Sequence, residues 1–452
     1  MFATAISPNN PINTIPICML AVSTGYMHGE RPYNGAPRRR IHSPVKSRMH
    51  CRPCYSKYLC SGQRTLKQGS ISFPHPAFAR TFFNRAPEVE QLTTRLKSKP
   101  CFTVLLGPPS SGKTALVRHV AARKRLDNTP EFHPLTIDLR EVATSEKGAF
   151  LNAFIDEGIS MATRDSFWDF MWTVAKVTGL GVSEPPSSQE AAKAFKELEG
   201  HLKPFSQPHG ERLPVLIIDE ANEFKGTDDK AICAFLNFAV RITKQESKMH
   251  VIFTSSDSFF ANWLKERVNP VHFNTLVVGD LPREEAYNYF LHVVKNHPHL
   301  SKQNKNRLES INFEIPFRMT GGRMLFIRQY VDQVHISGYF EDPMEFEPTL
   351  TARSCLEEDF RGKAKTYKKK EVLRVCQLLL DSDGYISYGG LSEELGNEVV
   401  EEMAERNLLH YRPVSRFSRD LIPPPTESVL TAQSKPALRA MEGLSKRYGE
   451  QS

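Results

Sequence analysis

The stretch that decides the fold is Thr103-Val104-Leu105-Leu106-Gly107-Pro108-Pro109-Ser110-Ser111-Gly112-Lys113-Thr114. Apolar and β-branched residues lead into the pattern G-x-x-x-x-G-K-T, and residues 115–120 continue with helical spacing. A strand, a glycine-containing loop and a helix in this order are the context in which the pattern forms a phosphate-binding loop. The alternative is a glycine turn before an ordinary helix, which the strand and helix on either side of the loop disfavour.

A loop of this kind brings several positive groups to one point. Its glycines let backbone N–H groups turn toward phosphates, and the following helix adds the positive end of its dipole. Lys113 is expected to reach the terminal phosphates and Thr114 to bind Mg²⁺ through its hydroxyl. The sequence therefore predicts binding of ATP with Mg²⁺. The expected contacts are Gly107, Pro108, Pro109, Ser110, Ser111, Gly112, Lys113 and Thr114.

Composition indicates a water-soluble chain of two or three domains. The chain has 452 residues, of which 40% are hydrophobic and 24% charged. Its longest apolar run, at residues 15–22, is far below the roughly 20 residues that cross a bilayer. The net charge of +8 is uneven, because residues 1–85 hold twelve Lys or Arg and one acid, Glu30. The remainder is slightly acidic, so the overall charge is no argument for nucleic-acid binding.

Residues 1–78 form a basic extension that is rich in Pro, Ser, Asn and Arg and lacks apolar periodicity. Such a segment cannot bury enough apolar surface to fold alone. It resembles an organelle transit peptide, which favours a mitochondrial location. A disordered tail, or a start codon assigned too early, would leave the protein cytoplasmic. Cys51, Cys54 and Cys60 hint at a zinc knuckle, although unligated cysteines are favoured because a second Cys pair is missing.

Alternating strands and helices predict an ATPase core over residues 79–281. We expect strands at residues 102–106, 132–139, 213–220 and 250–257 and a fifth within 271–281. Helices are expected in 148–205. This alternation is typical of a doubly wound α/β fold with a parallel sheet.

Two of these strands end in polar residues. The run 213–218 is apolar and is followed by Asp219 and Glu220, about 105 residues after the loop. In a parallel sheet this edge faces the ligand crevice. Asp219 is expected to hold Mg²⁺ through water and Glu220 to orient the attacking water; both could instead cap a helix. Ser255, Ser256 and Asp257 follow the next strand and suit either a phosphate contact or a cap.

The rest of the chain reads as mostly helical. Residues 282–366 are expected to form a helical lid and linker, with helices at 282–293 and 325–335 and a polar connection at 337–366. Residues 367–452 are predicted to hold short helices at 369–381, 388–395 and 398–407. Strands at 408–411 and 417–422 and a last helix at 436–447 follow. Three helices and a β-ribbon indicate a winged helix-turn-helix domain.

Several motifs in order resemble one family. They are F-F-N-R-x-x-E at residues 82–88, the glycine loop, I-I-D-E at 217–220, I-F-T-S-S at 252–256, G-D-L-P-R-E-E-A at 279–286 and T-G-G at 320–322. Together they resemble the archaeal-type P-loop ATPases, which are related to the STAND signalling ATPases and the AAA+ origin-recognition ATPases. The resemblance covers about residues 80–335. It differs at Met324, where the family's glycine motif usually continues to a proline.

The resemblance implies further site residues. Asn84 and Arg85 would lie near the nucleotide base, and Ser256 would match the family's first sensor. Arg267 stands where the family tends to keep a catalytic arginine. From the rim of the sheet it would reach a neighbour's nucleotide in a homo-oligomer, or else form a surface salt bridge.

Three functions fit these features. The first is an Mg²⁺-dependent ATPase that couples nucleotide state to movement of its lid and winged helix. The second is a slowly hydrolysing or non-hydrolysing switch whose ATP state gates binding of a protein partner or oligomerisation. The third is a nucleic-acid loader or remodeller. Against the third, the candidate recognition helix at 396–407 carries acidic residues that would repel DNA. They are Glu398, Glu401, Glu402 and Glu405, and a basic cluster at Lys363, Lys365 and Lys368–Lys370 suits a solvated linker or a phosphate contact.

Overall fold

A computed structural model describes residues 82–144 except Asn84, residues 213–359 except Asp228, and residues 364–449. Between 144 and 213 it describes residues 146, 149–150, 153–154, 195–196 and 199. The predictions for the basic extension, its cysteines and most of the helices within 148–205 lie outside these residues.

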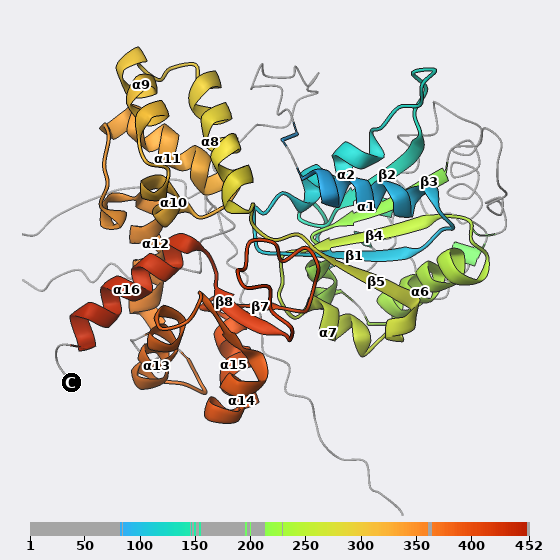
Figure 1. The fold of residues 1–452 in the computed structure, drawn as a ribbon. Coiled ribbons are helices and arrows are strands. Elements are labelled where there is room, and N and C mark those ends of the chain that lie inside the picture. The colour runs from blue at the N-terminus through green and yellow to red at the C-terminus, as the bar shows by residue number, and fades with distance from the viewer. Residues whose placement is uncertain are drawn as a thin grey trace, which may run out of the picture. The chain divides into compact units, whose positions relative to one another are not determined.

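A five-stranded parallel sheet forms the centre of the first part (Figure 1). Its strands are β1 Phe102–Leu106, β2 Phe132–Asp138, β3 Leu213–Asp219, β4 His250–Ser255 and β5 Phe273–Val277, in the order β2-β3-β4-β1-β5. All residues of β1 and β4 are buried, as expected for strands covered on both faces. The parallel α/β sheet predicted from the sequence is confirmed.

Helices cover both faces of this sheet. Helices α1 Ala86–Lys97 and α2 Lys113–Ala121 share a buried apolar cluster with one face. The other face packs on a turn of 3₁₀ helix, η1 Ala221–Gly226, and on α6 Asp229–Val240 and α7 Phe260–Lys265. A π-helical turn, η2 Arg241–Gln245, extends α6, and η3 Pro270–His272 precedes β5.

Helices follow the sheet, as predicted, but they are more numerous. They are α8 Arg283–Asn296, α9 Lys302–Ser310, α10 Glu314–Thr320 and α11 Met324–Ser337, with a short 3₁₀ turn, η4 Pro343–Glu345. Their own buried cluster includes Phe290 and Tyr330. Gly322, before α11, lies so close to the chain entering α8 that an added Cβ would be 1.9 Å from the Leu281 carbonyl oxygen.

The C-terminal part combines helices with a small antiparallel sheet. Its helices are α12 Glu347–Asp359, α13 Lys369–Leu380, α14 Tyr388–Leu395, α15 Asn397–Glu405 and α16 Lys435–Gly449. Its strands are β6 Tyr385–Ser387, β7 Leu409–Arg412 and β8 Val429–Ala432, in the order β6-β8-β7.

Two local predictions for this region are wrong. The polar connection expected at 337–366 contains α12, whose Ala352 and Leu356 join the buried cluster of α13 and α16. The strand expected at 417–422 is a loop, and the second strand of the ribbon is β8 instead. In that loop Arg419 and Asp420 bind partners elsewhere in the chain, and prolines at 423–425 cannot donate to a ladder.

None of the helices in the described parts is long and apolar enough to cross a membrane. Within the same residues, no disulfide joins the cysteines.

Candidate nucleotide-binding site

The loop between β1 and α2 depends on its two glycines. A Cβ on Gly107 would lie 2.2 Å from the Val278 carbonyl oxygen, so the chain after β5 leaves no room for a side chain there. Gly112 has φ +93°, in the left-handed region that glycine adopts without strain. Ser110 also has a positive φ, 61°. The loop is therefore held in a tight curl immediately before α2 begins at Lys113.

Lys113 lies inside this curl. Its side chain is 5% exposed, and Nζ donates hydrogen bonds to the carbonyl oxygens of Gly107 (2.9 Å) and Pro108 (3.0 Å). Burial lowers the pKa of Lys113 to about 8, although the carboxylates of Glu220 and Asp219 act in the opposite direction. The ammonium group is thus prepositioned at the point where the sequence predicts phosphate.

Thr114 and Asp219 meet at the carboxyl edge of the sheet. The Thr114 hydroxyl donates to Asp219 Oδ1 at 2.9 Å, across 105 positions in sequence. The same oxygen accepts from the Thr254 hydroxyl and, at 3.2 Å, from the backbone N–H of Glu220. A hydroxyl and a carboxylate are the hard oxygen donors that Mg²⁺ prefers. The two residues predicted to hold the metal are therefore adjacent and chemically suited to it.

Glu220 and Ser256 form a second pair beside them. Ser256 Oγ donates to Glu220 Oε2 at 2.8 Å. Glu220 has φ 51°, a left-handed conformation that costs a non-glycine residue free energy and often marks a functional position. The predicted residues Lys113, Thr114 and Asp219 thus share one edge with this pair, because parallel β1, β3 and β4 all end there.

Arg85 is buried and links two loops. Its Nη2 donates to the carbonyl oxygens of Ser111 (2.6 Å) and Gly279 (2.8 Å), and Nη1 lies 3.5 Å from Glu88. Its pKa is lowered by burial, although Glu88 and other nearby carboxylates oppose that effect. Arg85 therefore fastens the glycine loop to the chain leaving β5. The expectation that Asn84 and Arg85 lie near the nucleotide base stays a prediction, and Asn84 lies outside the described residues.

Arg267 has partners of its own. Its guanidinium lies 4.4 Å from the centre of the Trp263 ring, and Nη2 is 3.3 Å from Asp229. Among the described residues, no hydrogen bond or ion pair joins Arg267 to the Lys113 and Asp219 group. The surface salt bridge weighed from the sequence is present, and a role in trans stays a prediction.

Two residues at this edge, Thr254 and Arg140, were not singled out from the sequence. Thr254 donates a hydrogen bond to Asp219 from within β4. Arg140, just after β2, also contacts Asp219, with Nη2 at 3.3 Å from Oδ2. Arg323 pairs with Asp280 at 2.9 Å and lies close enough to Lys113 to lower its pKa. The available signal was the polar residues that follow β2 and β4, whose ends lie on either side of β3 in the sheet.

The loop between β7 and β8 contacts the same region. Arg412 and Asp420 form a two-bonded ion pair, at 2.6 and 2.7 Å, that lies directly on Gly279. Arg419 joins this loop to Glu88 of α1 at 3.0 Å and to Glu285 of α8 at 2.6 Å. The C-terminal part is therefore bonded to the chain that Arg85 ties to the glycine loop.

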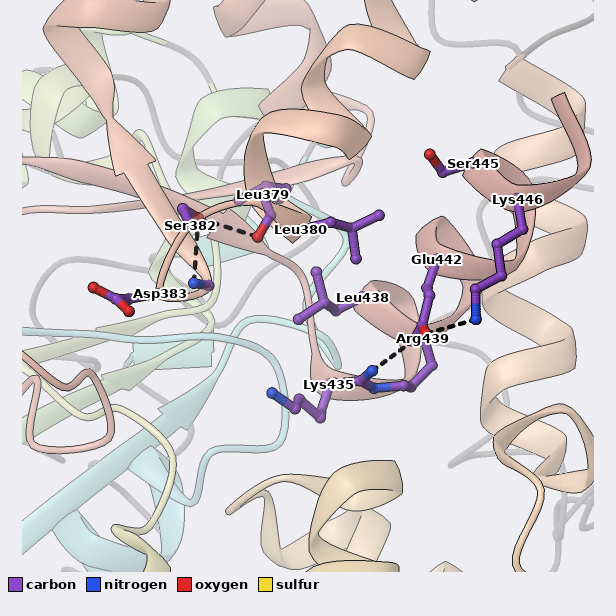
Figure 2. Close-up of a pocket in the computed structure, with 11 residues that line it drawn as sticks. Leu379, Leu380, Ser382, Asp383, Lys435, Leu438, Arg439, Glu442, Ser445 and Lys446 are labelled. Carbon is purple, nitrogen blue, oxygen red and sulfur yellow. Dashed lines mark hydrogen bonds and ion pairs between the residues drawn. The ribbon is translucent and has the colours of Figure 1, made fainter. Parts of the chain in front are cut away.

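Figure 2 shows a separate pocket of about 380 Å³, lined by the end of α13, the turn after it and α16. Arg439 and Lys446 both bind Glu442 there, at 2.5 and 3.0 Å. These lining residues all belong to the C-terminal part. The motif residues Lys113, Thr114 and Asp219 are not among the lining residues, so the sheet edge is the candidate nucleotide site.

The chain is similar to several proteins of known sequence or structure. Residues 82–323 match the family described as an ATPase domain predominantly from Archaea. An uncharacterised ATP-binding protein of Methanocaldococcus jannaschii is 23% identical over 366 residues, which cover 74% of this chain and 92% of the relative. One from Pyrococcus abyssi is 25% identical over 359 residues, or 75% and 96% of the two chains. A solved Walker-type ATPase of Pyrococcus abyssi is similar at 13% identity and a TM-score of 0.47, covering 80% and 96%.

Proposed function

Because this chain belongs to the ATPase family found predominantly in Archaea, we propose that it binds ATP at the β1–α2 loop and hydrolyses it with Mg²⁺. The observation that carries the proposal is the group at the sheet edge. Lys113 is held inside the loop, Thr114 is bonded to Asp219, and Glu220 is bonded to Ser256 (Figure 1 shows β1, β3 and β4 side by side).

Each residue has a task that follows from its contacts. The Lys113 ammonium exchanges its two carbonyl partners for phosphate oxygens. Thr114 and Asp219 would hold Mg²⁺, which neutralises phosphate charge when bound. Ser256 keeps the Glu220 carboxylate at a fixed angle, from which it orients the attacking water. Burial of Lys113 strengthens its attraction to phosphate because few waters screen it.

Nucleotide state is proposed to pass to the C-terminal part through Arg85. This arginine contacts the glycine loop at Ser111 and the chain after β5 at Gly279, on which the Arg412–Asp420 pair lies. A phosphate bound by the loop would shift Ser111. Arg85 would pass this shift to Gly279, and Gly279 would pass it to the ion pair of the β7–β8 loop. This favours an ATPase or ATP-dependent switch acting on a protein partner.

The C-terminal part is proposed to be a winged helix, since α13, β6, α14, α15, β7 and β8 follow the order of that domain. A nucleic-acid loader is less well supported. Helix α15 is acidic, and its Glu402 is engaged by the backbone N–H groups of Lys365 (3.0 Å) and Thr366 (2.8 Å). An interaction with protein fits this surface better than one with DNA.

The test of hydrolysis is Glu220→Gln, which keeps the size of the side chain and its contact with Ser256. We expect Mg–ATP affinity to stay within about threefold and turnover to fall on the order of 10²-fold or more. Glu223→Gln is the matched control, because Glu223 lies on the same turn and bonds to Asn222 instead. Wild-type turnover in Glu220→Gln would mean that this carboxylate is not catalytic.

A further inference from the structure

Arg140 has a half-exposed side chain and contacts the buried carboxylate of Asp219. It follows β2, whose last residue, Asp138, pairs in register with Asp219 at the end of β3. Arg140 Nε donates to Asp138 Oδ1 at 2.8 Å, and Nη2 lies 2.5 Å from Oδ2. Asp138 thus accepts hydrogen bonds from both Nε and Nη2, and the same Nη2 also reaches Asp219.

The contact with Asp219 is weaker and easier to exchange. Nη2 is 3.3 Å from Asp219 Oδ2, whereas Oδ1 of the same carboxylate is taken by hydroxyls. Half of the Arg140 side chain is exposed, so it faces the solvent from which a nucleotide arrives. Arg140 and the Thr114 hydroxyl, which is proposed to bind Mg²⁺, contact the same carboxylate, that of Asp219. Because the Arg140 side chain is half exposed, it can change partners without disturbing buried residues.

Charge balance indicates what replaces this contact. If Thr114 and Asp219 held Mg²⁺, the positive charge of the ion would offset that of the Asp219 carboxylate, and the attraction between Asp219 and Arg140 would weaken. The terminal phosphate would then be the anion that competes for the Arg140 guanidinium. A guanidinium binds phosphate oxygens through a planar fork, with charge-assisted hydrogen bonds.

We propose that Arg140 is an in-chain arginine that binds the terminal phosphate of ATP and so distinguishes ATP from ADP. This inference rests on the proposed function, because it needs a nucleotide in the β1–α2 loop. The inference places a positive charge of the same chain at the edge of the sheet. Arg267 does not supply this charge, because it is bonded to Asp229 and lies over the Trp263 ring. Asp138 is the positioning residue that holds Arg140 in place.

The test measures affinity for Mg–ATP and Mg–ADP by titration calorimetry in a Glu220→Gln background, where hydrolysis is suppressed. Arg140→Ala is expected to weaken ATP binding about tenfold or more, the range for a charge-assisted hydrogen bond, and ADP binding by less than threefold. Arg140→Lys keeps the charge without the fork and should fall between. Asp138→Asn, which leaves Arg140 in place but loosens it, should reduce the preference for ATP by a smaller factor.

Arg123→Ala is the matched control, because Arg123 is similarly exposed (41%) and pairs with a carboxylate, Glu131, away from the edge. It should bind both nucleotides as the parent does. An equal loss of ATP and ADP in Arg140→Ala, or no loss of either, would overturn the inference. Tighter binding of ATP by the parent at lower Mg²⁺ concentration would also overturn it, because Arg140 would then take the place of the metal ion. If the parent binds neither nucleotide, the proposed function itself fails.

Discussion

Removal of the Asp420 carboxylate should release the β7–β8 loop from the ATPase core. Asp420 and Arg412 are joined by two hydrogen bonds, and their side chains are 11% and 4% exposed. Asp420→Ala leaves the Arg412 charge buried without its partner, a change that typically costs about 3–5 kcal/mol. Asp280 lies within electrostatic range of Arg412 and offsets part of the loss, so we expect about 3 kcal/mol.

A cost of that size raises the population of the undocked loop on the order of 10²-fold. Phe417 reports on this population, because it is partly buried against the α1 and α2 cluster while the loop is docked. Chymotrypsin cleavage after Phe417 tracks the open population when the loop recloses faster than it is cut. The rate in Asp420→Ala should therefore rise on the order of 10²-fold over wild type, after correction for cleavage of the unfolded chains.

Two further variants test whether the effect comes from burial of the unpaired charge or from loss of any ion pair. Arg374 and Glu394 are also 2.6 Å apart, but their side chains are 50% and 40% exposed, so Glu394→Ala should leave the cleavage rate unchanged. Replacing both buried partners, as in Arg412→Met with Asp420→Leu, removes the unpaired charge and should restore most of the protection. A cleavage rate in Asp420→Ala within about twofold of wild type would refute the reasoning.

Three further outcomes are expected. Bound phosphate should raise the pKa of Lys113, which is about 8 without it. ATP affinity should therefore be constant below neutral pH and fall about tenfold per pH unit above pH 8, whereas Lys113→Arg should show little such fall. A flat wild-type profile by calorimetry would contradict this. Gly322→Ala places a Cβ 1.9 Å from the Leu281 carbonyl oxygen and should lower the free energy of unfolding by at least about 2 kcal/mol in urea titrations. A loss below about 0.5 kcal/mol would contradict this close approach. Residues 1–78 fused to a fluorescent protein should carry it into mitochondria, and diffuse cytosolic signal would leave the disordered-tail interpretation.

The strand–loop–helix order and the position of Asp219 and Glu220 at the end of β3, which the structure confirms, follow short-range rules. The glycine loop needs a strand before it and a helix after it, and both are legible in residues 103–120. Asp219 and Glu220 were placed because an apolar strand that ends in acids brings them to the ligand edge of a parallel sheet. Each of these inferences uses a single segment together with the known direction of the strands.

What was missed depends on contacts between distant segments. Thr254 and Ser256 both carry hydroxyls at the end of β4, and only the register of β3 against β4 decides which of them meets Asp219. Arg140 needed the pairing of β2 with β3. Arg85 bonds to Gly279, 194 positions away, and no local pattern indicates that contact.

The misplaced ribbon strand has the same origin. Residues 417–422 contain enough apolar residues to read as a strand, but Arg419 and Asp420 are committed to ion pairs with other parts of the chain. Local pattern could not show these partners, since Glu88 and Glu285 precede the loop by 331 and 134 positions.

The most direct test of the central claim is the affinity of the purified chain for Mg–ATP, measured by titration calorimetry beside Lys113→Ala and Lys124→Ala. Lys113 is buried in the loop, whereas Lys124 lies beyond α2 and serves as the control. We predict that wild type and Lys124→Ala bind Mg–ATP alike and that Lys113→Ala shows no measurable binding. Wild-type affinity in Lys113→Ala, or no binding by wild type, would contradict the assignment of this loop as the ATP site.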